Sequence, residues 1–507
     1  MAGIVVAAVL LFCVLSIWAF ISRSPVRLPP AGSRWPILNR LESLTKGKAV
    51  LYRVYQKQLS DNKPYLLRGI FGDSIVLPPS MLEWLVSQPE SHLSAKSAQM
   101  DALNIPLTFL RAEIGLNPVH EPLIRRNLTA HLDQITSYIW DEVGLALEEL
   151  WGQDTGVWRE VNLDYTIRHV VARASNRIFV GGELCRNNDY VESSLRYVSM
   201  VSACGLLINF FPNWIRHYVG VLFQIPIRVA YSQCSKHLLP IFSKLTSGEA
   251  GPCTHLFSSW LVTNSEKYPL SSLERTPDYL SRRIMALNFA SIHTTTLTTC
   301  NLLLDIFSDR NAASLLRDES LVSSASWNTT WNRGRLNQML RLDSALRESL
   351  RLWGLVAKAM SRKVMQPAGI ILPSGQHLPQ GTTVCVSGWG LHHDENVHQQ
   401  PFEFIHDRFM RRSTHGSSLS QEDTEKGISA GHAAAETDVN FAAWGIGKHA
   451  CPGRFFAVDL IKIILIHVLV DYEVELLGER PENMWIEYNV IPPPTATVSI
   501  RRHKLSV

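Results

Sequence analysis

The chain has 507 residues, of which 46 % are hydrophobic and 19 % charged, and its formal net charge is +4 at pH 7. This length suits one large domain or about three average ones, and the composition is that of a globular protein with a sizeable core. No dense block of Lys and Arg occurs, so a nucleic-acid-binding protein is not expected.

The eight cysteines are scattered and include no CxxC pair or other short-spaced framework. This spacing argues against a disulfide scaffold and a structural zinc site, and it favours a reducing compartment for most of the chain. We expect Cys451 to be functional and the other seven to act as small buried hydrophobic residues. Those seven are Cys13, Cys185, Cys204, Cys234, Cys253, Cys300 and Cys385.

The amino terminus carries an uncharged apolar run, MAGIVVAAVLLFCVLSIWAFI, and about 20 apolar residues are enough to cross a bilayer. A cleaved signal peptide would have its basic residues before the apolar core, whereas here Arg23, Arg27 and Arg34 follow it. Positively charged flanks stay on the cytosolic side. We therefore predict a transmembrane anchor at 1–22, with a lumenal amino terminus and a cytosolic body.

Proline-rich residues 23–36 cannot continue the anchor helix, so we expect a stiff hinge before the body of the chain at 37–507. From about residue 80 to residue 360, apolar residues recur at helical spacings of three and four. Strand-like runs occur before and after this region, in YLLRGIFGDSIVLPP, AGIILPSG, TTVCVSGW and ATVSIRR. The predicted fold is mainly α with small β-sheets in a single large domain.

Residues 205–227, GLLINFFPNWIRHYVGVLFQIPI, are strongly apolar, but Pro212, Asn213 and Arg216 interrupt them, so they make a poor spanning helix. Two interpretations stay open. They form buried core helices, or they form a surface that dips into the membrane and admits a lipophilic substrate.

A long helix is predicted to begin at TPDYLSRR, with Thr276 as its N-cap and Pro277 in its first turn. It continues through NFASIHTTTLTTCN, where several threonines follow one another. Consecutive threonines are poor helix formers, and their hydroxyl groups commonly do no more than bond to the preceding turn.

Two further segments stand between this helix and the carboxyl terminus. LRESLRL places Glu348 and Arg351 three residues apart on one helix face, a spacing that by itself is usually a solvated bridge worth about 0.2–0.5 kcal/mol. Residues 411–438 are small and polar, so we expect a surface loop there.

The stretch FAAWGIGKHACPGRFFA places Gly445, Gly447 and Gly453 around Cys451, with Pro452 directly after it. Zinc would need further short-spaced Cys or His ligands, and a nucleophile would need an activating base, which the sequence does not name. A haem ligand needs one rigidly held, shielded thiolate that accepts backbone hydrogen bonds. Glycines permit that backbone, Pro452 suits the first position of a helix, and the helix dipole favours the thiolate.

This stretch closely resembles the haem loop of the cytochrome P450 family, which has an aromatic residue, a glycine, a basic residue, the cysteine and a glycine. Here these are Trp444, Gly447, His449, Cys451 and Gly453, with Trp444 in place of the usual phenylalanine. The resemblance implies haem b with Cys451 as axial iron ligand, and GKHACPGRFFA looks like the version found in fungal enzymes.

Other landmarks follow the order of the family along nearly the whole chain. Glu348, Arg351 and Arg408 in FIHDRF resemble its buried Glu–Arg–Arg triad, although His406 replaces the usual proline. On the long helix, the residues at the oxygen site are Ala290, His293 and Thr294, with His293 in place of the usual acid.

The resemblance also suggests residues that contact the haem propionates. Arg125 resembles the arginine on an early helix of the family, Arg362 resembles the one that follows the Glu–Arg helix, and His449 is a third candidate. Each could equally be an ordinary surface charge. The glycosylation acceptors Asn127 and Asn328 are expected to be unused in a cytosolic domain.

The resemblance implies a monooxygenase of the endoplasmic reticulum membrane that takes electrons from an NADPH-dependent cytochrome P450 reductase and puts one atom of O2 into a lipophilic substrate. The resemblance of the haem loop to fungal enzymes suggests a tailoring step in the biosynthesis of a secondary metabolite such as a terpenoid, polyketide or alkaloid. Two other functions remain open. A haem-thiolate isomerase or dehydratase needs no reductase, but such enzymes tend to lose the threonine found here as Thr294. A non-catalytic haem-binding sensor would keep the same haem site.

Overall fold

The computed structural model describes residue 26 and residues 28–33, 35–69, 72–211, 213–249, 251, 253–324, 331–355, 357–410 and 433–504. The anchor predicted at 1–22, part of the hinge at 23–36, most of the loop at 411–438, Cys13 and Asn328 lie outside the described residues, so those predictions stay open.

The described part is mostly helical with small sheets, as predicted. The helices that precede the central helix are α2 (Pro36–Asp61), α3 (Leu82–Ser87), α4 (Ala95–Leu103), α5 (Ile105–Thr108), α6 (Glu113–Leu116), α7 (His120–Leu123), α8 (Leu132–Trp151), α9 (Leu163–Phe179), α10 (Gly182–Cys185), α11 (Asn188–Asn209), α12 (Asn213–Ser247) and α13 (Phe257–Thr263). The central helix and those after it are α14 (Pro277–Asn288), α15 (Thr294–Ser308), α16 (Arg310–Ser324), α17 (Arg333–Gln338), α18 (Leu340–Leu352), α19 (Gly388–His392) and α21 (Arg454–Asp471).

The strands gather into one five-stranded sheet, one three-stranded sheet and two hairpins. The large sheet has the order β1-β2-β8-β5-β3 and the smaller one the order β4-β12-β9. Only the pairing of β2 with β8 is parallel. The strands are β1 (Tyr65–Leu67), β2 (Ser74–Leu77), β3 (Leu93–Ser94), β4 (Arg159–Asn162), β5 (Lys358–Val364), β6 (Ile370–Ile371), β7 (His377–Leu378), β8 (Thr383–Ser387), β9 (Tyr472–Leu476), β10 (Met484–Ile486), β11 (Asn489–Ile491) and β12 (Thr497–Arg502).

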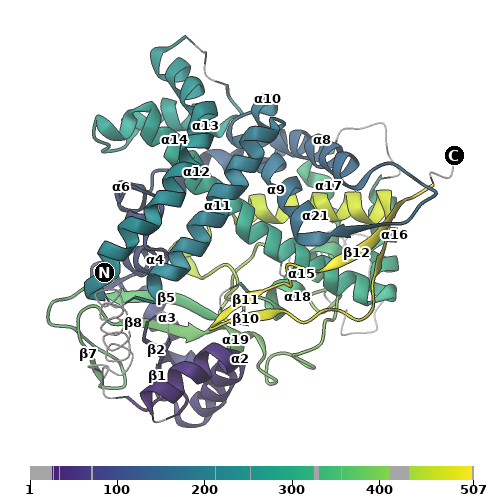
Figure 1. Ribbon diagram of the computed structural model, residues 1–507. Helices are drawn as coiled ribbons and strands as arrows, with labels where there is room; N and C mark the ends of the chain where they lie inside the picture. The colour runs from purple at the N-terminus through teal and green to yellow at the C-terminus, as the bar shows by residue number, and fades with distance from the viewer. Residues whose placement is uncertain are drawn as a thin grey trace, which may run out of the picture.

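The large sheet and α2 form one end of the molecule, and the helices fill the rest (Figure 1). α21 is apolar along most of its length, from Phe456 to Leu469, and nearly all of it is buried. A helix that is hydrophobic all round belongs inside a core. It packs against α8 and α16, and it carries the Cys451 loop at its amino end.

The central helix begins at Pro277 after Thr276, as predicted, although the Thr276 hydroxyl donates backwards to the Leu273 carbonyl at 2.7 Å and does not cap the helix. A π-helical turn, η5 (Phe289–His293), joins α14 to α15. Such single π turns inside α-helices occur frequently at functional sites.

The apolar segment at 205–227 is divided between the end of α11 and the start of α12. It is buried in part, so the core interpretation holds for only some of its residues, and the membrane surface stays a prediction. Ile208 and Ile227 are fully buried, whereas Phe210, Leu222 and Ile225 are exposed. Among the described helices, α11 alone is long and apolar enough to cross a bilayer, and just over half of its apolar window is buried within the protein.

Five of the seven cysteines expected to be buried are buried and free: Cys185, Cys204, Cys234, Cys300 and Cys385. For Cys253 the expectation was wrong, because it is only partly buried, with its sulfur 3.5 Å from the His255 ring.

Candidate functional site

The loop before Cys451 is closed by backbone hydrogen bonds. The Cys451 N–H donates to the Trp444 carbonyl at 2.7 Å, and the Trp444 indole N–H donates to the Ala434 carbonyl at 2.7 Å. Gly445 and Gly447 have φ values of +72° and +69°, a region that residues with a Cβ rarely adopt. The glycines are therefore required by the turn that delivers the cysteine.

The helix after the cysteine starts later than predicted. α21 begins at Arg454 with Gly453 at its cap, so Pro452 lies before the helix and not at its first position. Gly453 has φ −90°, which any residue adopts, and a Cβ there would meet only Ile124, at 4.0 Å. Packing within the described protein therefore does not explain this glycine.

Cys451 as a residue is only partly buried, yet the protein around it is dense enough that burial raises the pKa of its thiol. The backbone N–H groups of Gly453 and Arg454 and the charges of Arg454 and Arg125 lower the pKa, but burial outweighs them. The predicted stabilisation of the thiolate by its surroundings is thus only partial, and a bound cation would complete it.

Within the described residues, no group of three or more His, Cys, Asp or Glu side chains could hold a metal ion. A metal on Cys451 has no such group beside it in the described chain, and a haem needs none because its macrocycle supplies four nitrogens.

On the central helix, Ala290 and Thr294 are exposed although the residues around them are largely buried. The Thr294 hydroxyl donates to the Ala290 carbonyl at 2.6 Å, across the π turn, which leaves its lone pairs free to accept. The next threonines bond only to the preceding turn, as expected: Thr296 to Ile292, Thr298 to Thr294 and Thr299 to Thr295.

Comparisons with known proteins decide the family. The family described as Cytochrome P450 matches residues 119–500, which is most of the chain. The chain belongs to the cytochrome P450 family. It is an oxidoreductase of the P450 monooxygenase class, and members of this family bind haem through a cysteine thiolate.

Similar P450 proteins include fungal monooxygenases. Cytochrome P450 monooxygenase 71 of Postia placenta is 30 % identical, over 94 % of this chain and 93 % of that one. Cytochrome P450 monooxygenase astC of Aspergillus terreus is also 30 % identical, over 97 % and 95 % of the two chains. The structure of cyanobacterial CYP120A1 with bound retinoic acid is 18 % identical, has a TM-score of 0.65 and covers 94 % of this chain and all of that one, so it supports the fold.

In this P450 the three candidate cations for the propionates lie close to one another. Arg125, on the π turn η2 (Ile124–Leu128), donates to the carbonyls of Lys448 and Ala450 at 3.0 and 3.2 Å. Burial lowers the pKa of His449, and the charges of Arg362 and Arg125 lower it further.

Sequence reasoning missed Glu90, the carboxylate among these cations. Glu90 accepts from His449 at 3.0 Å, and the Ser94 hydroxyl and the Ala95 N–H also donate to it. Arg362 is 5 % exposed, and its one hydrogen bond within the described chain goes to the adjacent Ser361 carbonyl. Burial lowers the pKa of Arg362, which means that its charged form is disfavoured there. A nearby anion would stabilise that charged form.

Three charged residues form a buried cluster next to α18. Glu348 accepts from Arg351 at 2.8 Å and from Arg408 at 2.9 Å, and both Glu348 and Arg351 are fully buried. Arg351 also donates to the carbonyls of His392 and Pro401. The cluster thereby fixes the segment that leads towards the cysteine loop. His406, at the position of the family's proline, is buried with its Nδ1 atom unpartnered.

Arg347 is a second buried arginine of α18, and sequence reasoning did not find it. It donates to the carbonyls of Ala433 and Glu436 and pairs with Asp438 at 2.6 Å. Its guanidinium lies 3.9 Å from the centroid of the Phe441 ring. It therefore holds the chain just before the cysteine loop. The only signal for Arg347 in the sequence is its position directly before the glutamate of LRESLRL.

His293, predicted as a catalytic residue, lies on the π turn with its ring stacked on Phe289. Burial lowers its pKa, the charge of Arg168 lowers it further and that of Asp164 opposes this. Asp164 and Arg168 form an ion pair of 2.6 Å on α9. The ring is thus favoured in its neutral form.

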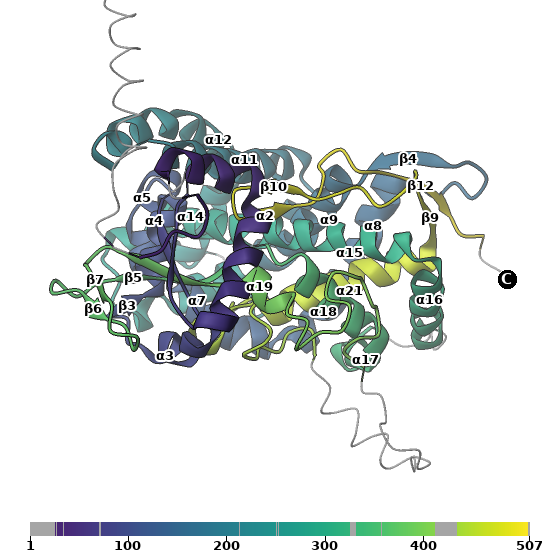
Figure 2. The same ribbon diagram turned by 90° about the horizontal axis from the view of Figure 1, so that it is seen from below.

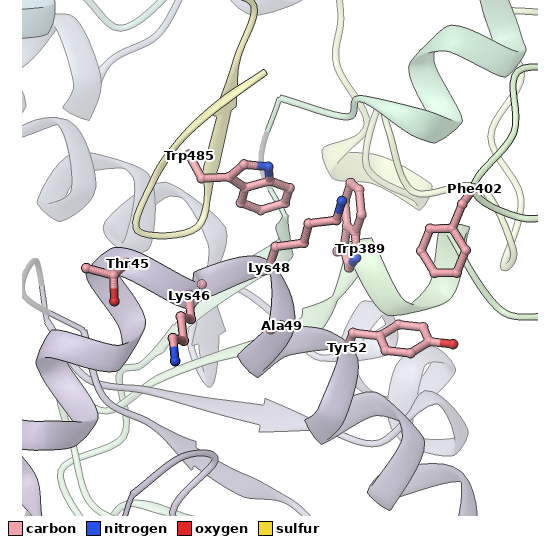
Figure 3. Close-up of a pocket in the computed structure, with 9 residues that line it drawn as sticks. Thr45, Lys46, Lys48, Ala49, Tyr52, Trp389, Phe402 and Trp485 are labelled. Carbon is pink, nitrogen blue, oxygen red and sulfur yellow. The ribbon is translucent and has the colours of Figure 1, made fainter. Parts of the chain in front are cut away.

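A pocket of about 470 Å³ lies away from Cys451, between α2, α19 and β10 (Figure 3). Its walls are aromatic, with the Trp389 and Trp485 rings edge to face at 4.9 Å. Among its described lining residues there is no His, Cys, Asp or Glu, the side chains that most often bind metals. Its lining residues are Thr45, Lys46, Gly47, Lys48, Ala49, Tyr52, Trp389, Phe402 and Trp485.

Proposed function

We propose that this P450 is a membrane-anchored monooxygenase that inserts one atom of O2 into a lipophilic substrate, with Cys451 as the axial ligand of haem b. Electrons would come from NADPH through cytochrome P450 reductase. The observation that carries the proposal is the loop itself: one shielded cysteine, delivered by two glycines at positive φ, with no other metal-binding cluster in the described chain.

Three groups would hold the cofactor from its edge. Arg362 is buried without an ion-pair partner in the described chain, and Arg125 and His449 lie near it. Guanidinium groups bind carboxylates through charge-assisted hydrogen bonds, and the neutral imidazole of His449 can donate one N–H, so these groups suit the two propionates. Gly453 leaves room beside the sulfur for a flat group to approach the backbone.

The bound haem would supply the activation of dioxygen; the chain's own residues would position it and manage protons. Thr294 is suited to this task because its hydroxyl oxygen can accept a hydrogen bond while its proton is donated to the Ala290 carbonyl. Once that bond breaks, the hydroxyl can donate its proton to another group. The neutral His293 beside it would pack, and it would pass protons only at low pH.

Two apolar surfaces support contact with a membrane. Trp35, Leu38 and Leu41 are exposed at the start of α2, and Leu222 and Ile225 are exposed on α12. Both regions lie along the upper edge of the molecule in Figure 2. Exposed apolar faces of this kind mark membrane or partner contacts. With the anchor at 1–22, they would set the cytosolic domain on the endoplasmic reticulum membrane.

The substrate is proposed from the relatives. Monooxygenases astC of Aspergillus terreus and polB of Polytolypa hystricis are fungal proteins that align over most of this chain. For this chain we propose the tailoring of secondary metabolites such as terpenoids, polyketides or alkaloids. Spectral titration against a panel of such metabolites, followed by product analysis with reductase and NADPH, tests this. NADPH oxidation that no compound stimulates would contradict it.

A further inference from the structure

A small pocket lined by three arginines lies on α12, away from the cysteine loop. Its volume is about 220 Å³, and we call it the arginine pocket. Its lining residues are Leu110, Arg111, Arg228, Tyr231 and Arg282, from the loop after α5, from α12 and from α14.

Arg282 forms the fixed base of the arginine pocket. It donates to both carboxylate oxygens of Asp278, at 2.8 and 3.1 Å, and its guanidinium lies 4.0 Å from the centroid of the Tyr231 ring. The Tyr231 hydroxyl donates to the same carboxylate at 2.9 Å. Asp278 is therefore already satisfied. The Nη1 atom of Arg282, by contrast, is buried and has no hydrogen-bond partner in the described chain.

Arg111 and Arg228 form the rim. Both are exposed, and neither makes an ion pair with a carboxylate of the described chain; Arg228 donates to the Gln224 amide at 2.9 Å. Leu110, just before Arg111, has φ +62°, a conformation that costs a branched residue free energy and persists only when its surroundings impose it. The loop is thus held in place with its arginine at the pocket.

At this pocket the guanidinium groups outnumber the carboxylates of the described chain that bond to them. Three guanidinium groups face one carboxylate, Asp278, and the next acid, Glu113, accepts from the Tyr279 hydroxyl at 3.3 Å. Planar guanidinium groups bind phosphate oxygens in pairs, so a phosphate group is the ligand that three of them suit best.

An exposed apolar face of α12 adjoins the arginine pocket. Leu222, Ile225 and Val229 are 66, 59 and 54 % exposed on one face of α12, and Arg228 lies at the edge of that face. We propose that the arginine pocket binds the phosphate headgroup of an anionic membrane lipid whose acyl chains lie along this apolar face. Basic side chains beside apolar surface are the usual means of holding such lipids. This inference rests on the proposed membrane contact of α12.

Native mass spectrometry of the full chain in detergent, titrated with dioleoylphosphatidic acid or dioleoylphosphatidylcholine, tests the headgroup directly. We expect one phosphatidic acid to be retained at concentrations where phosphatidylcholine is not. Arg111→Gln and Arg228→Gln should each weaken its retention about tenfold, since each removes a charged hydrogen bond. Arg196→Gln is the control and should change nothing. Arg196 lies on α11 and donates to Gln233 of α12, outside the pocket.

Equal retention of the two lipids, or an equal loss in Arg196→Gln, would overturn the inference. If millimolar inorganic phosphate displaces phosphatidic acid, and phosphate alone binds as tightly as the lipid does, the pocket binds a soluble anion and the proposed lipid is wrong. Hydroxyl-radical footprinting of α12 in phosphatidylcholine nanodiscs tests the membrane contact separately. The Soret band of the reduced carbon-monoxide complex tests the haem site independently of both.

Discussion

The Nε2 atom of His392 accepts the backbone N–H of Ala442 at 2.9 Å, which joins α19 to the segment that leads into the cysteine loop. His392 is buried, and burial together with the nearby Arg351 lowers its pKa to about 3. A neutral ring is required for this bond, because a protonated imidazole has no lone pair to offer. The junction is therefore sensitive to acid.

The first prediction concerns pH. The folded-state pKa of His392 lies below that of an unfolded histidine, near 6.5, so the unfolded chain binds more protons between the two values. The resulting stability is full above about pH 6.5 and is lost as the pH falls, by up to about 1.4 kcal/mol per pH unit. His393 and His398 have lowered pKa values too and add to the slope.

Thermal or urea unfolding between pH 7.5 and pH 5 measures this slope. His392→Asn should be less stable than the wild type at pH 7.5, and its stability should fall less steeply with acid. Parallel slopes in the two proteins would show that His392 is not the group that titrates.

The second prediction concerns the axial ligand. Cys451→Ala should remove the red-shifted Soret band of the reduced carbon-monoxide complex, because that band requires a thiolate on the iron. Cys253→Ala is the control, since Cys253 is the other described cysteine that is only partly buried. If the band survives in Cys451→Ala, the assignment of the ligand is wrong.

The third prediction concerns Thr294. Thr294→Ala removes the exposed hydroxyl of the central helix, and we expect unchanged haem content and reductase-driven NADPH oxidation, with output moved from product to hydrogen peroxide. Thr296→Ala is the matched control, because its hydroxyl is buried and bonds only to Ile292. His293→Ala should cause a smaller change if that ring only packs. An unchanged ratio of product to NADPH in Thr294→Ala would return the isomerase and sensor functions to consideration.

The fourth prediction concerns the docking of the reductase. Lys448 is exposed beside the cysteine, whereas Arg454 donates to the carbonyls of Ala435 and Cys451 and is partly buried. Lys448 is therefore the better test of a docking charge. Complementary charges accelerate encounter and are screened by salt. Turnover with reductase should fall as ionic strength rises, and less steeply in Lys448→Glu. Identical salt dependence would remove Lys448 from the docking face.

The fifth prediction concerns the buried charges. Glu348→Gln leaves Arg351 fully buried without its counter-ion, and breaking such a cluster costs about 3–5 kcal/mol. We expect a matching loss in the free energy of unfolding, or little folded haem protein on expression. Glu473→Gln breaks the partly exposed pair with Arg501 and should cost less than about 1 kcal/mol. Similar losses for both would show that the cluster does not carry this stability.

What the sequence determined by itself is mostly local. The start of the central helix at Pro277, the back-bonding threonines and the glycine turn before Cys451 all depend on residues a few positions apart, whose conformational preferences are short-range. The same reasoning placed the start of α21 at Pro452, two residues too early. The first residue of a helix depends on the geometry of its cap, which the types of the neighbouring residues do not determine.

Only the tertiary structure decided which distant groups meet. Glu90 lies beside His449, Arg347 holds Phe441, and Arg282 faces Arg111, although each pair is far apart in the chain. No periodicity relates such positions, because their contacts are set by how helices and sheets pack against one another. Buried charges such as Arg347 and Arg351 take their partners from whichever backbone carbonyl or carboxylate the packing brings within reach, because burying a charge without partners costs free energy.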